Sequence, residues 1–572
     1  MIKIKTFIIF GPTHTGKSTL AGYFMIQNMT ERQVIEFENK HKKQVEKEGN
    51  EYQNDMRLSY FIDEGPDDHR RYQGQNRNSK GTTKKTHIKT LDNLTYEFPD
   101  MKLQILDTPG SDQNYRILNR AISMADIGIY LIDINEIFKF ACMLEDNTDL
   151  EYVDLYQKII RPISYWYNLK RDALKTLIIV FSKIDQINYN QIKINAAVRK
   201  IRSYSYLTNV PICPISIDIM NLTSYHIFYN SNFMKWYDKE QSLVSLMNRS
   251  FYFNIQDLAT DQENKREPLF GFVDTKIKPR YKSKEVLRAR ILCGKLTLKD
   301  DIIIGPVVDE MKVPFFLNGK VKTVMPQGKK DENITELDTG SIGSVSFDYL
   351  YKNNSSQNVE LKYVNPTRLS VFYSTSITNS IEKGNVLIVK IKTPIDKHAV
   401  KMNFKLGCNL LLVWFGKFIN MTLIGVNSNE ESYYLTLFKK QDSYEDVFIL
   451  PIHELKSKNK YIFYRFALQI ENRELLPVNL KKIMTLNNDN KLSMIVSFKN
   501  MISDCQTIQD YMSKNSSNYF EYTNMVSSDS QEKELLICKT ITSENLKDIL
   551  RYLRNMIDNL NINSQSININ FE

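Results

Sequence analysis

Short apolar runs recur up to about residue 215 and alternate with longer stretches whose apolar positions have helical spacing. The first run, 6–10, is β-type and ends at Gly11, and a helix-like segment follows at 19–29. Apolar strands separated by helices predict a doubly wound parallel sheet, with ligand-binding loops at the carboxyl ends of its strands. The later strands of this pattern are 102–106, 126–134, 176–181 and 210–215, a hairpin strand is expected within 87–98, and helices are expected at 36–47 and 153–169.

The segment that joins the first strand to the first helix, Gly11 to Ser18, has the pattern G-x-x-x-x-G-K-S. In this strand–loop–helix context, backbone N–H groups and the helix N-terminus attract a triphosphate. Lys17 would reach the β- and γ-phosphates, and the Ser18 hydroxyl would ligate Mg²⁺. A glycine turn that fits the pattern by chance is the alternative, and the polar segments downstream argue against it.

One such segment, Asp107-Thr108-Pro109-Gly110, ends the strand 102–106. At the carboxyl edge of a parallel sheet, it places a carboxylate and a backbone N–H beside the phosphates. Asp107 would hold Mg²⁺ through water, and the Gly110 N–H would meet the γ-phosphate. The pattern D-x-x-G is weak alone, but it is a strong signal about ninety residues after a phosphate loop.

A second segment, Ser182-Lys183-Ile184-Asp185, ends the strand 176–181 and predicts the base. The Asp185 carboxylate can accept hydrogen bonds from guanine N1–H and from the exocyclic amine. Adenine offers no such donor pair, so a buried and unpaired Asp185 would reject it. The stem of Lys183 can cover the face of the ring. An ordinary surface turn after a strand is the alternative for this tetrapeptide.

Composition sets broad limits on this interpretation. The 572 residues allow three or four domains, and 42% apolar residues exclude global disorder. A net charge of +10 is compatible with RNA contact but is also common without it. The six cysteines are scattered, which fits free thiols and gives no support to a zinc site. With no signal peptide and no apolar run of about 18 residues, we expect a cytoplasmic protein.

These motifs resemble those of the translational GTPases, and most closely the eukaryotic and archaeal branch that contains elongation factor 1-alpha. Gly11 to Ser18 matches the phosphate loop, and Asp107 to Gly110 matches the second switch. Lys80-Gly81-Thr82-Thr83 lies where that branch has its first switch. Ser182 to Asp185 lies at the guanine-specificity position, and Pro214-Ile215-Ser216 resembles the last base-contacting loop.

The resemblance implies the bound groups GTP or GDP and Mg²⁺, and it assigns roles residue by residue. It makes Ser18, Thr83 and Asp107 the magnesium residues, and it gives catalytic roles to Lys17, Thr83, Gly110 and Ser111. The nucleotide contacts that it implies are Gly11, Pro12, Thr13, His14, Thr15, Gly16, Lys17, Ser18, Thr19, Asp107, Gly110, Ser182, Lys183, Asp185 and Ser216.

The expected fold is an α/β P-loop NTPase G domain followed by two β-barrel domains and a short C-terminal extension that contains a helix. We expect the domains at 1–256, 266–393, 400–500 and 501–572, with polar loops or linkers at 487–491 and 514–533. Near the end, Ser543 can cap a helix with one apolar face. This helix either packs on the third domain or docks a partner. Its apolar positions are Leu546, Ile549, Leu550, Leu553, Met556, Ile557 and Leu560.

Two departures from the family bear on activity. The family has His directly after D-x-P-G, where it orients the attacking water, and this chain has Ser111. Hydrolysis should therefore be slow unless another group, such as His87, substitutes; a surface histidine is the plainer interpretation of His87. The family also has Asn where this chain has Ser182. Ser can make only part of the contact to the phosphate loop, so we expect weaker nucleotide affinity with guanine preference retained.

The resemblance implies a GTP-binding protein that delivers a tRNA or a tRNA-like protein to the ribosome. In that cycle, the γ-phosphate would order both switches and set the domain orientation. The alternative is a hydrolysis-impaired structural or interaction subunit that keeps GTP as a stabilising ligand. A termination or rescue factor is a further alternative, although those factors usually carry a long segment before the G domain.

Overall fold

The computed structural model divides the chain into two compact units, Met1–Asp301 with Lys320–Asp348, and Ile302–Gly319 with Tyr349–Glu572. The residues that it describes are 3–27, 29–47, 57–58, 92–97, 101–108, 115–142, 149–169, 176–204, 207–225, 227–228, 234, 236–237, 242–250, 269–277, 286–308, 314–326, 336–352, 358–359, 365–375, 381–392, 406–414, 417–429, 432–439, 448–451, 466–469, 475–484, 486, 492–499, 510–511, 521–526, 532–542, 545–559 and 567–571.

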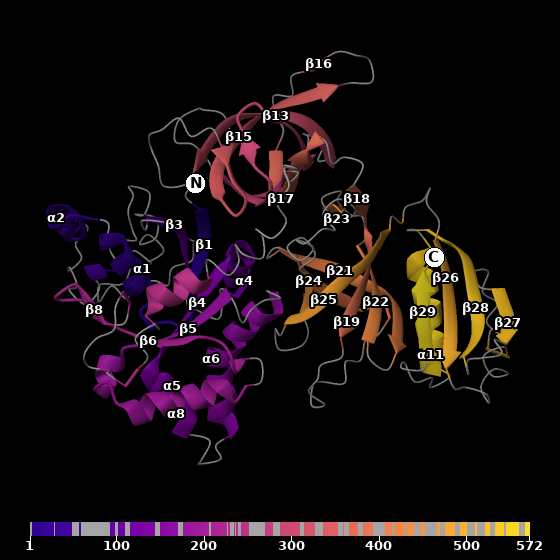
Figure 1. Ribbon diagram of the computed structural model, residues 1–572. Coiled ribbons are helices and arrows are strands. Elements are labelled where there is room, and N and C mark those ends of the chain that lie inside the picture. Colours follow the sequence, from indigo (N-terminus) through magenta and orange to yellow (C-terminus); the bar gives the residue numbers. More distant parts are fainter. Residues whose placement is uncertain are drawn as a thin grey trace. The chain divides into compact units, whose positions relative to one another are not determined.

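A six-stranded sheet forms the centre of the N-terminal domain, with strand order β2-β3-β1-β4-β5-β6 (Figure 1). All neighbouring strands are parallel except β2, which pairs antiparallel with β3 at the edge. The five strands expected from the apolar runs and the hairpin strand expected within 87–98 are thus confirmed. Their bounds are β1 (Lys3–Phe10), β2 (Asp92–Glu97), β3 (Met101–Asp107), β4 (Ile127–Asp133), β5 (Leu177–Ser182) and β6 (Ile212–Pro214).

Helices alternate with these strands, as expected for a doubly wound sheet. The second helix begins before the expected residue 36, because Thr30 and Gln33 cap it reciprocally: the Thr30 N–H donates to Gln33 Oε1 at 2.8 Å, and the Gln33 N–H donates to Thr30 Oγ1 at 3.3 Å. The helices are α1 (Lys17–Ile26), α2 (Glu31–Lys47), α4 (Tyr115–Met124), α5 (Ile134–Cys142), α6 (Asp149–Leu169), the 3₁₀ turn η3 (Ile184–Ile187) and α8 (Gln191–Arg202).

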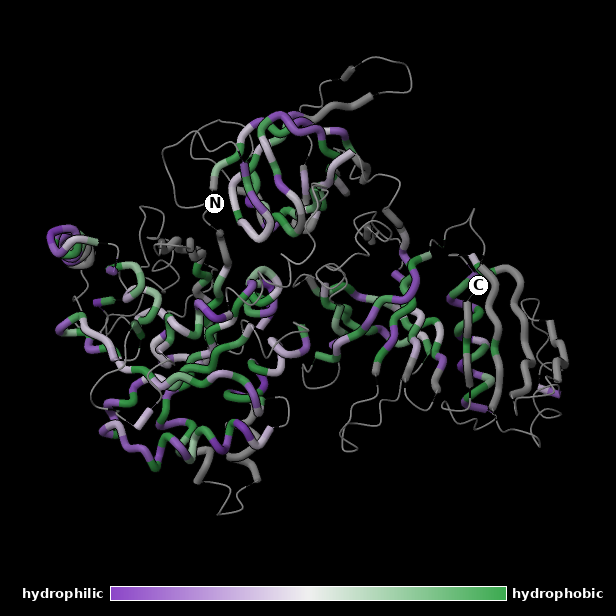
Figure 2. The backbone as a smooth tube through the Cα atoms, viewed as in Figure 1, coloured by the Kyte–Doolittle hydropathy of each residue, from purple (hydrophilic) through white to green (hydrophobic). Residues whose placement is uncertain are grey.

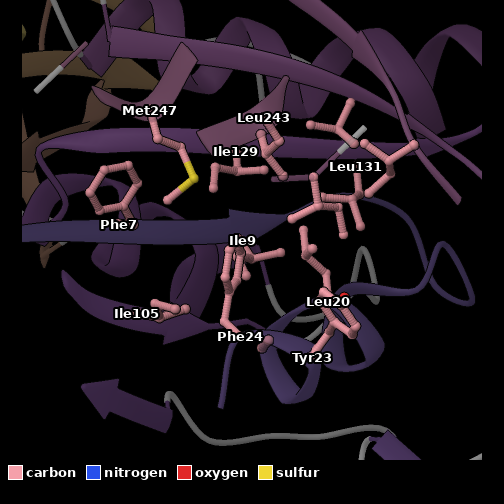
Figure 3. Close-up of a cluster of buried hydrophobic side chains, with 14 of the residues drawn as sticks. Phe7, Ile9, Leu20, Tyr23, Phe24, Ile105, Ile129, Leu131, Leu243 and Met247 are labelled. Atoms are coloured by element: carbon pink, nitrogen blue, oxygen red, sulfur yellow. The ribbon is translucent and has the colours of Figure 1, made fainter. Parts of the chain in front are cut away.

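The core of this domain joins the sheet to α1. Phe7 and Ile9 of β1, Leu131 of β4, and Leu20 and Phe24 of α1 are all essentially inaccessible and belong to one apolar cluster (Figure 3). Burying large apolar side chains between β1, β4 and α1 stabilises the strand–loop–helix junction from beneath. The segment 11–16 is therefore held at both ends by packed elements.

The second sheet has strand order β10-β9-β17-β12-β13-β15-β16, and a further pairing of β10 with β15 closes six of these strands into a barrel. A turn joins β11 to β12, and in it the Asp300 carboxylate accepts hydrogen bonds from the N–H and the hydroxyl of Thr297, at 2.7 and 2.5 Å. The strands are β9 (Phe270–Ile277), β10 (Val286–Cys293), β11 (Leu296–Thr297), β12 (Asp301–Val308), β13 (Pro314–Pro326), β14 (Glu336–Leu337), β15 (Ile342–Lys352), β16 (Asn358–Val359) and β17 (Asn365–Ser374).

A second, closed barrel follows, with strand order β19-β22-β21-β20-β24-β25. Its first strand, 386–392, pairs with β22 and β25 and therefore belongs to this barrel. The expected range of the preceding domain, 266–393, includes these residues. The strands of this region are β18 (Ile381–Gly384), β19 (Val386–Lys392), β20 (Asn409–Trp414), β21 (Lys417–Asn429), β22 (Ser432–Phe438), β23 (Phe448–Pro451), β24 (Phe466–Gln469) and β25 (Leu475–Met484).

The C-terminal region contains more β-structure than its composition suggests. A four-stranded sheet has the order β27-β28-β26-β29, and β27 lies inside the polar stretch 514–533, for which the sequence predicts a loop or linker. Antiparallel pairing to β28 stabilises this polar strand, a long-range contact that composition cannot report. The elements are β26 (Leu492–Lys499), β27 (Glu521–Val526), β28 (Glu532–Ile541), α11 (Leu546–Asn559) and β29 (Ile567–Phe571).

The helix α11 is amphipathic, with hydrophobic and hydrophilic positions alternating along it (Figure 2). Its buried side chains share one apolar cluster with Val386 and Ile424 of the closed barrel and with Val496 and Ile569 of the C-terminal sheet. Packing on the third domain is therefore confirmed. The buried positions of the helix are Leu546, Ile549, Leu550, Leu553 and Met556, and Ile557 is partly buried against the same cluster.

The start of α11 is capped by residues other than the expected one. The Thr542 N–H donates to Asn545 Oδ1 at 2.8 Å, and the Asn545 N–H donates to Thr542 Oγ1 at 3.4 Å. These reciprocal bonds satisfy two N–H groups at the helix entrance. The expected cap, Ser543, and the last expected apolar position, Leu560, lie outside the described residues.

Among the described residues, no helix is both long enough and apolar enough to cross a membrane.

Replacing Leu553 by Ala should destabilise the layer that α11 forms with the closed barrel. Leu553 is fully buried, and deleting a buried leucine side chain costs about 2–5 kcal/mol because a cavity remains. Calorimetry of the full chain should show a lower midpoint for the transition that includes α11. Asn555→Ala, at an exposed position of the same helix, is the control and should leave that midpoint unchanged. Equal midpoints for both variants would contradict the packing described.

Candidate functional site

The loop between β1 and α1 has a backbone that glycine makes possible. Gly11 has φ 145° and Gly16 has φ 89°, both in the region that L side chains rarely adopt. A Cβ on Gly11 would lie 2.1 Å from the Leu131 carbonyl oxygen of β4. The chain therefore turns off β1 directly against the neighbouring strand, and no larger residue fits at position 11.

Two side chains close this loop on one carbonyl group. The Lys17 ammonium donates to Pro12 O at 2.5 Å, and the Thr15 hydroxyl donates to the same oxygen at 3.0 Å. Lys17 is 7% exposed and opens α1, whose N-terminal N–H groups attract anions. The predicted contacts at 11–19 thus lie together in one loop and one helix end.

Ser182, at the end of β5, connects this loop to the next part of the site. Its hydroxyl is buried and lies 2.8 Å from Thr15 O and 3.2 Å from Ile132 O. One hydroxyl proton serves one of these acceptors at a time. Serine thus makes the contact that the family makes with an amide, with a single donor.

The residues predicted to recognise the base meet one another. The Ser216 hydroxyl donates to Asp185 Oδ1 at 2.6 Å, which joins the loop after β6 to the turn after β5. Asp185 is exposed, in contrast to the expected buried carboxylate, because it lies in the first turn of η3 at the protein surface. Discrimination against adenine would therefore depend on the pairing pattern rather than on burial alone.

Lys183 is positioned by a residue that the sequence analysis missed. Lys183 has φ 59°, and its ammonium lies 2.8 Å from Asp133 Oδ2 at the end of β4. Asp133 also accepts the Asn135 N–H at 2.9 Å. The signal for it was present, because a carboxylate that ends a buried parallel strand lies at the ligand-binding edge.

Tyr189 is a second residue that the sequence analysis missed. Its hydroxyl is hydrogen-bonded to Ser216, and its ring contacts Tyr225 with centroids 6.0 Å apart. Burial raises the pKa of Tyr189 above its ordinary value, so the phenol stays protonated at neutral pH.

Several predicted residues lie outside the described part of the chain, namely Thr83, Gly110, Ser111 and His87. Of Asp107 only the backbone is described: it ends β3 and pairs with Ile9 of β1, two residues before Gly11. The Thr108 hydroxyl donates to Ile9 O at 3.0 Å and is buried. Within the described ranges, no group of three or more His, Cys, Asp or Glu side chains could by itself hold a metal ion.

Residues 2–218 match the sequence model of the family described as "Elongation factor Tu GTP binding domain". Over these residues the chain is similar to the GTP-binding domain of elongation factor Tu. This match covers the loop at 11–18, the end of β3, the turn after β5 and the loop after β6. A comparison with curated protein sequences finds no match.

The similarity of the chain to solved structures extends beyond the N-terminal domain. The S. cerevisiae Ski7 GTPase-like domain bound to GDP and inorganic phosphate has a TM-score of 0.59 and 15% identity, and covers 84% of this chain and 97% of its own. The same domain bound to GTP gives 0.57, with the same identity and coverage. Elongation factor SelB from Methanococcus maripaludis, in complex with a GTP analogue, gives 0.48 at 12% identity, over 94% of this chain and 98% of its own. At these identities the likeness concerns the fold.

Replacing Ser182 by Ala should weaken guanine-nucleotide binding to the GTP-binding domain. The change removes the donor to the Thr15 carbonyl, and one hydrogen bond contributes about 1 kcal/mol, so affinity should fall roughly fivefold. Titration calorimetry with GDP measures it. Ser203→Ala removes an exposed hydroxyl that donates to Lys200 O at the end of α8, and it should leave the affinity unchanged. Equal affinities for wild type and Ser182→Ala would show that the contact does not matter for binding.

Proposed function

We propose that the chain binds guanine nucleotides at the loop 11–18 and the turn 182–185 and that it hydrolyses GTP slowly. The observation that carries the proposal is the Ser182 hydroxyl 2.8 Å from Thr15 O, which couples a phosphate-binding loop to a base-reading turn. A phosphate-binding loop and a base-binding turn that are joined by a hydrogen bond suit a nucleoside triphosphate. The match to a GTP-binding domain over 2–218 supports this choice of ligand.

Each part of the ligand has a proposed partner. Phosphate oxygens would accept hydrogen bonds from the N–H groups of 13–19 and from the Lys17 ammonium. Lys17 would then exchange its bond to Pro12 O for bonds to the phosphates. Asp185 would accept from guanine, with Oδ1 already held by Ser216. The stem of Lys183, anchored by Asp133, would lie against the base.

Mg²⁺ would be held by the Ser18 hydroxyl, with Thr83 and Asp107 completing the set. Oxygen donors of this kind suit Mg²⁺, which usually binds one or two protein ligands and the substrate phosphates. Ser18 lies in the first turn of α1, and the backbone of Asp107 runs beside Ile9, so both approach the same end of β1. When bound, the ion would neutralise charge on the β- and γ-phosphates.

More specifically, we propose that the chain is a translation-related factor that works in the cytoplasm with the ribosome and with a tRNA or a tRNA-like protein. The family resemblance supports this role. The second candidate is a subunit that holds GTP for stability and interaction rather than turnover. Ser111 at the position of the family's histidine favours this candidate, and similarity to a GTPase-like domain solved with GTP is consistent with it.

Replacing Asp185 by Asn should shift base preference from guanine toward xanthine. The amide offers a donor where the carboxylate offers only acceptors, and xanthine presents an oxygen where guanine has its amine. Competition between GDP and xanthosine diphosphate measures the preference. Glu136→Gln removes one negative charge elsewhere in the same domain and should keep the guanine preference. If Asp185→Asn still prefers guanine, the base assignment is wrong.

Replacing Ser111 by His should accelerate GTP hydrolysis, because a positioned acid–base or water-orienting side chain contributes roughly 10²–10⁴-fold. Single-turnover assays on the purified chain measure the rate, and Ser111→Ala should match the wild type.

Adding ribosomes to the wild-type assay separates the two candidate functions. Stimulated turnover would remove the structural subunit, and tight GTP binding without turnover in either condition would remove the delivery cycle.

A further inference from the structure

Two arginine–aspartate pairs join the GTP-binding domain to the strands β9 and β10 within the first compact unit. In the first pair, Arg120 of α4 binds Asp274 of β9 in bidentate fashion, with Nε–Oδ1 at 2.7 Å and Nη2–Oδ2 at 2.6 Å. Asp274 is 1% exposed. Two parallel, charge-assisted bonds fix orientation as well as distance.

The second pair runs in the opposite direction. Arg290 of β10 reaches the GTP-binding domain, where its Nη2 lies 2.7 Å from Asp126 Oδ1 and its Nη1 lies 3.1 Å from the Thr6 hydroxyl. Arg290 is 4% exposed. Each side of the contact thus supplies one arginine and one carboxylate, and we name the four residues Arg120, Asp274, Arg290 and Asp126 the double clamp.

Each carboxylate of the double clamp also accepts a hydrogen bond from a residue of its own domain. Asp126 Oδ2 accepts the Thr6 N–H at 3.0 Å within the GTP-binding domain. Asp274 Oδ2 accepts Arg288 Nε at 2.7 Å from the neighbouring strand β10. Burial pushes the pKa of Asp274 upward, but the charges of Arg288 and Arg120 outweigh it and hold the pKa below its ordinary value. Both carboxylates are therefore positioned in advance.

The double clamp also lies apart from the residues proposed to touch nucleotide. Asp126 directly precedes β4 and donates its N–H to Thr6 O at 2.7 Å, whereas the nucleotide loops follow the carboxyl ends of β1 and β5. Arg120 lies in the second half of α4. No member of the clamp belongs to the segments 11–19, 107–110, 182–185 or 216, and α4 itself begins at Tyr115, after the second of these segments.

We infer that the double clamp holds β9 and β10 on the GTP-binding domain in one orientation, with GTP, with GDP and without nucleotide. No residue of the double clamp is among those proposed to contact the γ-phosphate, and a ligand shifts a conformational equilibrium only through differential affinity for the two states. This inference rests on the proposed function where it concerns nucleotide. It differs from the expectation that the γ-phosphate sets the domain orientation.

Distance measurement on the full chain tests the inference. Spin labels carried by an unnatural amino acid at Asn195 of α8 and Lys320 of β13, both exposed, leave the native cysteines untouched. Electron–electron dipolar spectroscopy should give one narrow maximum at the same distance without nucleotide, with GDP and with a non-hydrolysable GTP analogue. A maximum that moves between GDP and the analogue would overturn the nucleotide independence.

Clamp variants complete the test. Arg120→Gln combined with Arg290→Ala should broaden the distance distribution in every nucleotide state, including the nucleotide-free one. Arg120→Gln alone, a milder change, should broaden it less. Lys322→Ala breaks an exposed pair with Asp348 on β13 and β15 and should leave it narrow. A double variant that is folded by circular dichroism and as narrow as wild type would overturn the clamp. Failure to bind GDP or GTP would refute the proposed function and would leave the nucleotide-free comparison intact.

Discussion

The hydrogen bond from the Ser182 hydroxyl to the Thr15 carbonyl is the contact on which the site depends. It connects a loop that follows β1 to a turn that follows β5, two strands separated in the sheet by β4. The hydroxyl also lies within reach of Ile132 O on β4, so one small side chain of β5 contacts two other structural elements. Its single proton can serve only one of these acceptors at a time, which limits the strength of this junction.

Sequence alone was enough to predict the GTP-binding domain because its determinants are local. Residues of β4 and β5 are almost all inaccessible, so each strand appears as a continuous apolar run, and the polar residue that ends the run marks the ligand edge. The loop between β1 and α1 was predictable for a similar reason, since Gly11 and Gly16 both have positive φ and Gly11 also packs directly against Leu131 O. Pattern and geometry agree wherever the determinant lies within a few residues.

The parts that escaped prediction depend on contacts between distant residues. Asp133 belongs to the site because it pairs with Lys183, and Tyr189 because it is hydrogen-bonded to Ser216. In both pairs the two residues are far apart along the chain. The polar strand β27 is defined by its pairing with β28 rather than by composition. The first strand of the closed barrel, β19, is placed by its pairing with β22 and β25, two strands that lie far from it along the chain.

The clamp and the substitution at position 111 have consistent physical consequences. If β9 and β10 stay fixed on the GTP-binding domain, then α4 is fixed as well, because Arg120 binds Asp274 while Ala121 and Ile122 of the same helix are buried. On the proposed function, a change at the γ-phosphate would then act through elements other than α4. A partner would then detect the bound nucleotide at those elements, and the rate of hydrolysis would set how long each state lasts.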